Sequence, residues 1–149
     1  MRTAIFVGSF DPYTIGHDDI ARRALALVDQ LVIGVGINER KTCSRNAEQR
    51  INAIAQLYAG EPRIQVMGFS GLTIHFAQQV GAQFVVKGVR SVKDFEYERE
   101  QADINRQLSG LETILLPAQP HLAAISSSLV RELEHFGEDI SAYLPKNKT

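Results

Sequence analysis

The stretch Gly8-Ser9-Phe10-Asp11-Pro12-Tyr13-Thr14-Ile15-Gly16-His17 decides the fold, together with what stands on either side of it. Residues 3–7 form a short apolar run, which is typical of a strand buried on both faces. Residues 18–28 carry apolar side chains at helical spacing, namely Ile20, Ala24, Leu27 and Val28. The chain is therefore predicted to run from a strand through a tight turn into a helix.

This turn carries the groups that a phosphate site needs. Gly8 and Gly16 have no side chains, so backbone N–H groups there can approach a ligand closely. Ser9, Thr14 and His17 add donors at the start of a helix, where unpaired N–H groups and the helix dipole favour an anion. We therefore predict a phosphate-binding turn, although an ordinary strand-to-helix loop shares the general pattern.

The same residues resemble a family signature, G-[ST]-F-[DN]-P-x-[TH]-x-G-H, of the nucleotidylyltransferase superfamily. In that signature the histidines, the glycine and the threonine contact a nucleoside triphosphate. With Thr14 at the [TH] position, the turn is most similar to the phosphopantetheine adenylyltransferase branch. The resemblance implies that Ser9, Phe10 and His17 contact ATP.

Composition limits the remaining possibilities. A chain of 149 residues is most simply one domain, spanning residues 1–149, and 44% hydrophobic with 22% charged residues is ordinary for a globular protein. The net charge of −1 provides no general attraction to nucleic acid or to an anionic membrane. A single cysteine, Cys43, suits a reducing compartment. Without a leader or an apolar run of about 20 residues, a cytoplasmic location is expected.

Apolar runs and helical patterns alternate along the rest of the chain. Further strands are predicted at 31–36, 64–67, 84–86 and 113–116, and further helices at 46–59, 73–80, 94–108 and from 126 to about 136. Such alternation predicts the α/β class, here a single doubly wound, Rossmann-like domain with a five-stranded parallel sheet and helices on both faces. The Gly34-x-Gly36 pair in the second strand lacks the rest of a dinucleotide-binding fingerprint and is not read as one.

Ligands of such sheets bind beyond the carboxyl ends of the strands, and the candidate residues fall there. Lys87-Gly88-Val89-Arg90 follows the fourth strand, and an arginine there can clamp a phosphate with two hydrogen bonds. Residues 87–98 resemble the family segment [RK]-G-[LVI]-R-x-x-x-D-[FY]-E-Y-E. The resemblance implies that Lys87 binds the phosphate of the acceptor substrate, and that ATP contacts Gly88, Val89, Arg90 and Glu98.

Lys41, in the loop after the second strand, is either a solvated surface lysine or a phosphate ligand. The family places its acceptor-phosphate lysine here, so the resemblance favours the second interpretation. It also implies that Ser9 and Thr73 bind the acceptor. After Lys41 the family usually has an apolar or aromatic pair, and Ser44-Arg45 stand there instead, so these residues do not predict the apolar wall of the family's acceptor pocket.

The last helix begins with a run of serines. One of them is expected to be an N-cap, but three in succession exceed what capping needs. Residues 125–131 resemble the superfamily motif I-S-[ST]-[ST]-x-x-R, which wraps the phosphates of ATP. The implied ATP contacts here are Leu122, Ala123, Ala124, Ile125, Ser126, Ser127 and Ser128. Residues 122–124 are smaller than is common in the family, so weaker stacking on adenine is expected.

The resemblance extends from Ala4 to Leu144 and implies adenylyl transfer from ATP to 4′-phosphopantetheine, giving dephospho-coenzyme A and pyrophosphate in coenzyme A synthesis. It implies that His17, Lys41 and Arg90 are catalytic, that Mg²⁺ is bound mainly through the ATP phosphates, and that the protein is a homo-oligomer, by family a hexamer. No protein metal site, nucleic-acid partner or membrane partner is predicted.

Two other functions remain open from the sequence. A sibling enzyme acting on nicotinate mononucleotide would share the first turn and the serine motif, but normally has histidine at the position of Thr14 and lacks the segment from Asp94 to Glu98. A nucleotide-sensing module without turnover could use the same fold. The joint presence of His17, Lys41 and Arg90 argues against such a module.

Overall fold

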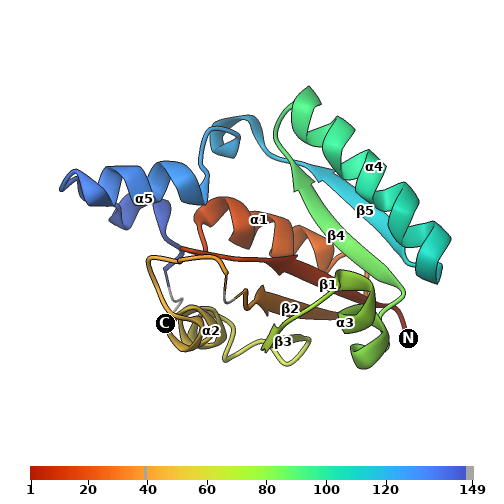
Figure 1. Cartoon of the computed structure of the whole chain (residues 1–149). Helices are drawn as coiled ribbons and strands as arrows, with labels where there is room; N and C mark the ends of the chain where they lie inside the picture. The colour runs from red at the N-terminus through yellow and green to blue at the C-terminus, as the bar shows by residue number, and fades with distance from the viewer. Residues whose placement is uncertain (39, 147–149) are drawn as a thin grey trace.

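Five parallel strands form one sheet in the order β3-β2-β1-β4-β5 in the computed structural model, which describes residues 1–38 and 40–146 (Figure 1). The strands are β1 (Thr3–Gly8), β2 (Gln30–Gly36), β3 (Ile64–Phe69), β4 (Phe84–Val89) and β5 (Glu112–Pro117). Central β1 pairs Ile5 with Val32 of β2 on one side and with Val85 of β4 on the other. The predicted five-stranded parallel sheet is confirmed.

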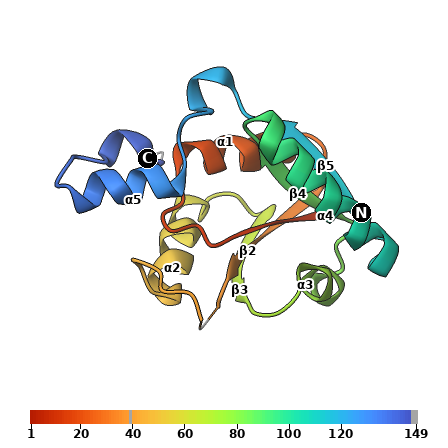
Figure 2. The ribbon, with the colours of Figure 1, turned by 45° about the horizontal axis from the view of Figure 1, so that its top comes forward.

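Helices cover both faces of this sheet, as predicted. The helices are α1 (Ile15–Ala24), α2 (Ala47–Leu57), α3 (Thr73–Val80), α4 (Val92–Ser109) and α5 (Ser127–His135), with short 3-10 turns at Pro120–Leu122 and Ser141–Tyr143. Because side chains alternate along a strand, Phe6 packs with α1 and α2 while Ile5 packs with α3 on the opposite face. Helix α4 packs on β4 and β5, and α5 projects beyond the edge at which β1 ends (Figures 1 and 2).

Capping residues decide where the helices begin. Helix α1 begins at Ile15 rather than at the predicted Asp18, because the Thr14 side chain accepts a hydrogen bond from the backbone N–H of His17. Its regular part ends at Ala24, before the predicted Val28. The predicted capping box at Asn46 is present at the start of α2, and the cap at Gly81, with φ of 73°, ends α3 as predicted.

Two predictions about apolar side chains have different outcomes. On α4 the large apolar side chains are exposed, as expected for a surface helix: Val92, Phe95, Tyr97, Ile104 and Leu108. On α5 the predicted apolar stripe is partly wrong, because Val130 is fully buried whereas Phe136 is 74% exposed. The helix ends at His135, so Phe136 is its C-cap and no longer follows the buried face.

Gly34 of β2 serves packing, in agreement with the rejection of a dinucleotide motif. A side chain on Gly34 would collide with the ring of Phe76, which α3 presses onto the sheet and which stacks on Phe69 with centroids 4.5 Å apart. Over the described residues, no helix is both long enough and apolar enough to cross a bilayer.

Candidate active site

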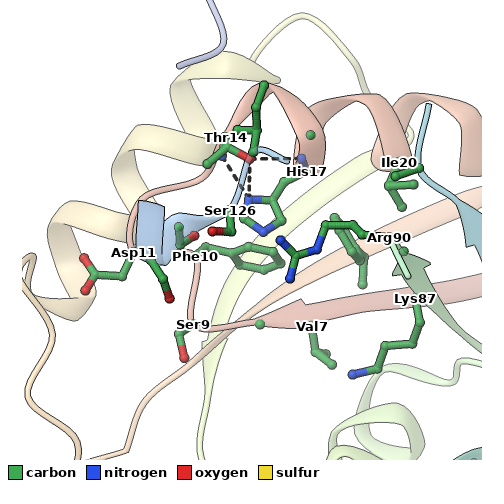
Figure 3. Close-up of a pocket in the computed structure, with 18 of the residues that line it drawn as sticks. Val7, Ser9, Phe10, Asp11, Thr14, His17, Ile20, Lys87, Arg90 and Ser126 are labelled. Carbon is green, nitrogen blue, oxygen red and sulfur yellow. Dashed lines mark hydrogen bonds between the residues drawn. The ribbon is translucent and has the colours of Figure 1, made fainter. Parts of the chain in front are cut away.

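A large cavity lies beyond the carboxyl ends of β1 and β4 (Figure 3). These two strands are neighbours at the point where the strand order reverses, which is where open α/β sheets bind their ligands. The cavity holds about 370 Å³, enough for a nucleotide-sized ligand. Most predicted site residues line it: Ser9, Phe10, His17, Lys41, Lys87, Gly88, Arg90, Glu98, Leu122, Ile125, Ser126, Ser127 and Ser128.

Four predicted site residues do not line this cavity: Thr73, Val89, Ala123 and Ala124. Thr73 begins α3, on the sheet face opposite α1. Val89 is the last residue of β4 and lies between two residues that do line the cavity, Gly88 and Arg90. Their predicted contacts with bound substrates stay predictions.

His17 is held by the backbone of the turn that precedes it. Its Nδ1 accepts a hydrogen bond of 2.9 Å from the Thr14 N–H, so the hydrogen of the neutral ring stands on Nε2. Burial, and next the positive charge of Arg90, lower the pKa of His17 from 6.5 to about 4. In Figure 3 the Arg90 guanidinium lies beside the imidazole. His17 is therefore a neutral hydrogen-bond donor near neutral pH.

The three predicted cations reach the cavity from two segments: Lys41 from the loop after β2, and Lys87 and Arg90 from the end of β4 and the residue that follows it. Lys41 donates from Nζ to the Ser9 hydroxyl at 3.0 Å, which links the loop after β2 to the first turn. Lys87 lies 3.6 Å from Glu98 Oε2, and that buried oxygen accepts no hydrogen bond from any residue that the structure describes. Arg90 pairs with Asp94 at 3.3 Å on the solvent side. The cavity is therefore positively charged where these side chains meet.

The serine run does more than cap a helix. Ser126 accepts from the Leu129 N–H as the N-cap, which confirms the prediction for one serine. Ser127 donates to the Pro12 carbonyl at 2.7 Å and so ties α5 to the first turn. Ser128 accepts from Arg131, whose guanidinium also donates to the Asp11 carbonyl. The first N–H groups of α5 and its dipole face the cavity, an arrangement that favours an anion.

The glycines near the site have packing roles that the sequence did not predict. A side chain on Gly8 would lie 3.0 Å from the ring of Phe10, and one on Gly88 would lie 3.0 Å from Ile20. Both glycines therefore make room for neighbouring side chains, in addition to bordering the cavity. The sequence predicted only close approach of a ligand, because it did not show which side chains pack over the strand ends.

Asp11 is an organising residue that the sequence analysis missed. Its buried carboxylate accepts three hydrogen bonds, from the Ser44 N–H at 2.8 Å, the Ser44 hydroxyl at 3.0 Å and the Arg45 N–H at 3.1 Å. Burial alone would raise the pKa of Asp11, but these bonds and Arg131 bring it below the ordinary 3.8. The Ser44-Arg45 pair therefore anchors the loop of Lys41. Asp11 and Ser44 are 33 residues apart, so no local sequence pattern indicates that they interact.

The described residues contain no cluster of three or more His, Cys, Asp or Glu that could hold a metal ion. Of the two carboxylates at the cavity, Asp11 is occupied by Ser44 and Arg45, and Glu98 lies beside Lys87. A cation at this site would therefore depend on a bound ligand for most of its oxygen ligands.

Known proteins resemble this chain over nearly its whole length. The family model described as cytidylyltransferase-like matches residues 5–133. The chain is 54% identical to the phosphopantetheine adenylyltransferase of Bacteroides thetaiotaomicron over 98% of this chain and 97% of that protein. It is 52% identical to the phosphopantetheine adenylyltransferase of Porphyromonas gingivalis, over 96% of this chain and 94% of that protein. It is 41% identical to that of Flavobacterium psychrophilum, over 98% of this chain and 97% of that protein.

Among solved structures, a putative nicotinate-nucleotide adenylyltransferase from Vibrio parahaemolyticus superposes with a TM-score of 0.71 at 18% identity, covering 98% of this chain and 95% of that one. This likeness confirms the fold. The family model and the relatives together go further: the chain belongs to the phosphopantetheine adenylyltransferases, within the cytidylyltransferase-like family of nucleotidyltransferases.

Proposed function

We propose that this protein transfers the adenylyl group of ATP to the phosphate of 4′-phosphopantetheine, forming dephospho-coenzyme A and pyrophosphate. The observation that carries the proposal is the meeting of His17, Lys41, Lys87 and Arg90 at one cavity at the switch point of the sheet. These groups suit two phosphorylated ligands that must lie end to end. Close relatives bear the name of this enzyme.

The reaction is an in-line displacement at the α-phosphorus of ATP. A phosphate oxygen of the acceptor forms the new P–O bond, and the bond from the α-phosphorus to the α–β bridging oxygen breaks as pyrophosphate leaves. Nucleophile and leaving group are both ionised, so the step needs no general base. Catalysis then rests on positioning and on stabilising the charge that develops at the α-phosphate.

Each side chain has a role in this scheme. The Nε2–H of His17 donates to the oxygens of the α-phosphate in the transition state, and the Arg90 guanidinium holds the triphosphate. Lys41 and Lys87 hold the acceptor phosphate. Ser9, which already accepts from Lys41, stands between the two ligands. The N–H groups and hydroxyls at the start of α5 bind the remaining ATP phosphates.

We also propose that Mg²⁺ enters bound to ATP, because the carboxylates at the cavity already have partners. When bound, the ion neutralises phosphate charge. A homohexamer and a cytoplasmic location complete the proposal. The exposed apolar side chains of α4, such as Phe95 and Leu108, support self-association. Light scattering, which measures the mass of the particle in solution, tests the hexamer.

The proposed function is tested by pyrophosphate release from ATP with 4′-phosphopantetheine and with nicotinate mononucleotide as alternative acceptors. We expect release with the first acceptor alone. Release only with the second identifies the sibling activity, and ATP binding without release under either acceptor identifies a nucleotide-sensing module. Both of these results contradict the proposal.

A matched pair of variants tests the acceptor site in the same assay. Lys41→Met should raise the KM for 4′-phosphopantetheine about 10- to 100-fold, the loss expected for one charge-assisted contact, with little change in the KM for ATP. Lys93→Met, at an exposed lysine of α4, should change neither constant. Equal effects of the two substitutions contradict the role of Lys41.

A further inference from the structure

The imidazole of His17 is enclosed by two aromatic rings. Tyr13 stacks on it with ring centroids 5.3 Å apart and planes inclined by 26°. Phe10 meets it edge-on at 5.0 Å and 85°. With Nδ1 already bonded to the Thr14 N–H, the stacked ring blocks the rotation that would turn Nε2 away from the cavity.

The ring of Tyr13 is itself tethered at its tip. Its hydroxyl lies 2.6 Å from the hydroxyl of Tyr58, and Tyr58 donates to the carboxylate of Asp18. Because an ionised carboxylate only accepts, the Tyr58 hydrogen points to Asp18 and Tyr13 must donate to Tyr58. Arg22 holds the same carboxylate at 2.9 Å. The tether therefore runs from Tyr13 to a residue adjacent to His17 in α1.

Both phenols are buried, with Tyr13 6% and Tyr58 3% exposed. Burial raises the pKa of each above its ordinary value, so both keep their hydrogens near neutral pH. Two phenylalanines would fill the same space without burying hydroxyl groups. The hydrogen bond between the two hydroxyl groups restricts the plane and position of the Tyr13 ring more closely than packing alone would.

We propose that Tyr13, tethered by Tyr58 and Asp18, is a positioning residue that holds the His17 imidazole with its Nε2–H directed at the reacting phosphate. The proposal rests on the proposed function, in which that N–H donates to the α-phosphate. Tyr13 occupies the x position of the signature, where the pattern specifies no residue, so the family resemblance does not itself assign this role to Tyr13.

Variants separate the stack from the tether. Tyr13→Leu removes the aromatic face, and Tyr13→Phe keeps the face and removes the tether. We expect kcat to fall about 10- to 30-fold in the first and about 3- to 10-fold in the second, with the KM for ATP changed less than about twofold. Tyr143→Phe, at a tyrosine of the final 3-10 turn outside the cavity, is the control and should leave kcat unchanged.

The second measurement does not depend on turnover. Nitrogen NMR of the His17 ring in the intact protein should show one neutral tautomer, with hydrogen on Nε2, in the wild type and in Tyr13→Phe. In Tyr13→Leu the ring can rotate away from the Thr14 N–H, so the two neutral tautomers exchange and the signals of the two nitrogens should move toward each other. If the wild type transfers no adenylyl group, the proposed function fails, and these spectra still decide whether Tyr13 orients His17.

Two results overturn the proposal. One is a folded Tyr13→Leu protein with the kcat of the wild type, and the other is an unchanged ring spectrum in that variant. Should Tyr13→Leu not fold, Tyr58→Phe replaces it, because that substitution removes the tether and keeps the stack. Tyr58→Phe must then lower kcat about threefold or more while the KM for ATP stays constant. A Tyr58→Phe protein with the kcat of the wild type overturns the proposal.

Discussion

Replacing Asp11 by asparagine tests the hydrogen bonds that hold the Lys41 loop. The carboxylate accepts from the Ser44 N–H at one oxygen, and from the Ser44 hydroxyl and the Arg45 N–H at the other. An amide has one oxygen, so either orientation of Asp11→Asn leaves one backbone N–H facing an NH₂ group. An unpaired buried N–H costs about 1–3 kcal/mol, and loss of the charge weakens the remaining bonds by about 1 kcal/mol.

The expected loss in the free energy of unfolding is therefore about 2–4 kcal/mol at pH 7. With a urea m-value of about 2 kcal/mol/M, the midpoint should fall by about 1–2 M, measured at one fixed protein concentration. Asp139→Asn is the control. That carboxylate is exposed and accepts a local bond from the Ser141 N–H, so its midpoint should not move.

The pH dependence checks the cause. Because the pKa of Asp11 in the folded protein lies below the ordinary 3.8, its contribution to stability is complete above that value. It is lost as the pH falls through the folded-state pKa, so the wild type and Asp11→Asn should converge in acid. Equal urea midpoints at pH 7, or a difference that persists unchanged in acid, would refute the assignment.

Three further predictions concern the site and the sheet. His17→Ala should lower kcat about 10²–10³-fold, which is the loss typical of one transition-state donor. Calorimetry should show a nearly unchanged affinity for ATP. A lost affinity for ATP with kcat preserved contradicts the role of His17 as a transition-state donor. Because the pKa of His17 is about 4, the kcat of the wild type should show no inflection from His17 between about pH 5.5 and 8. An inflection near pH 6.5 that disappears in His17→Ala contradicts the assignment of His17 as a neutral donor. Gly34→Ala forces a methyl group against Phe76 and should lower the urea midpoint, whereas Gly60→Ala, with open space around it, should not.

The local pattern of the sequence determined much of this protein. The apolar runs predicted the five strands, and the capping box at Asn46 and the glycine after Val80 predicted helix ends, because these features depend on residues within one or two turns of each other. The Gly8–His17 signature, the segment 87–98 and the serine motif with the residues before it together named most of the residues that line the cavity.

The tertiary structure decided what these residues touch. Ser44 and Arg45, which the sequence marked only as a departure from the family, became ligands of Asp11. Gly88 made room for Ile20, and Tyr58 held the hydroxyl of Tyr13. Partners separated by 30 to 70 residues meet only after the strand order brings their segments together, and spacing along the chain carries no signal of that order.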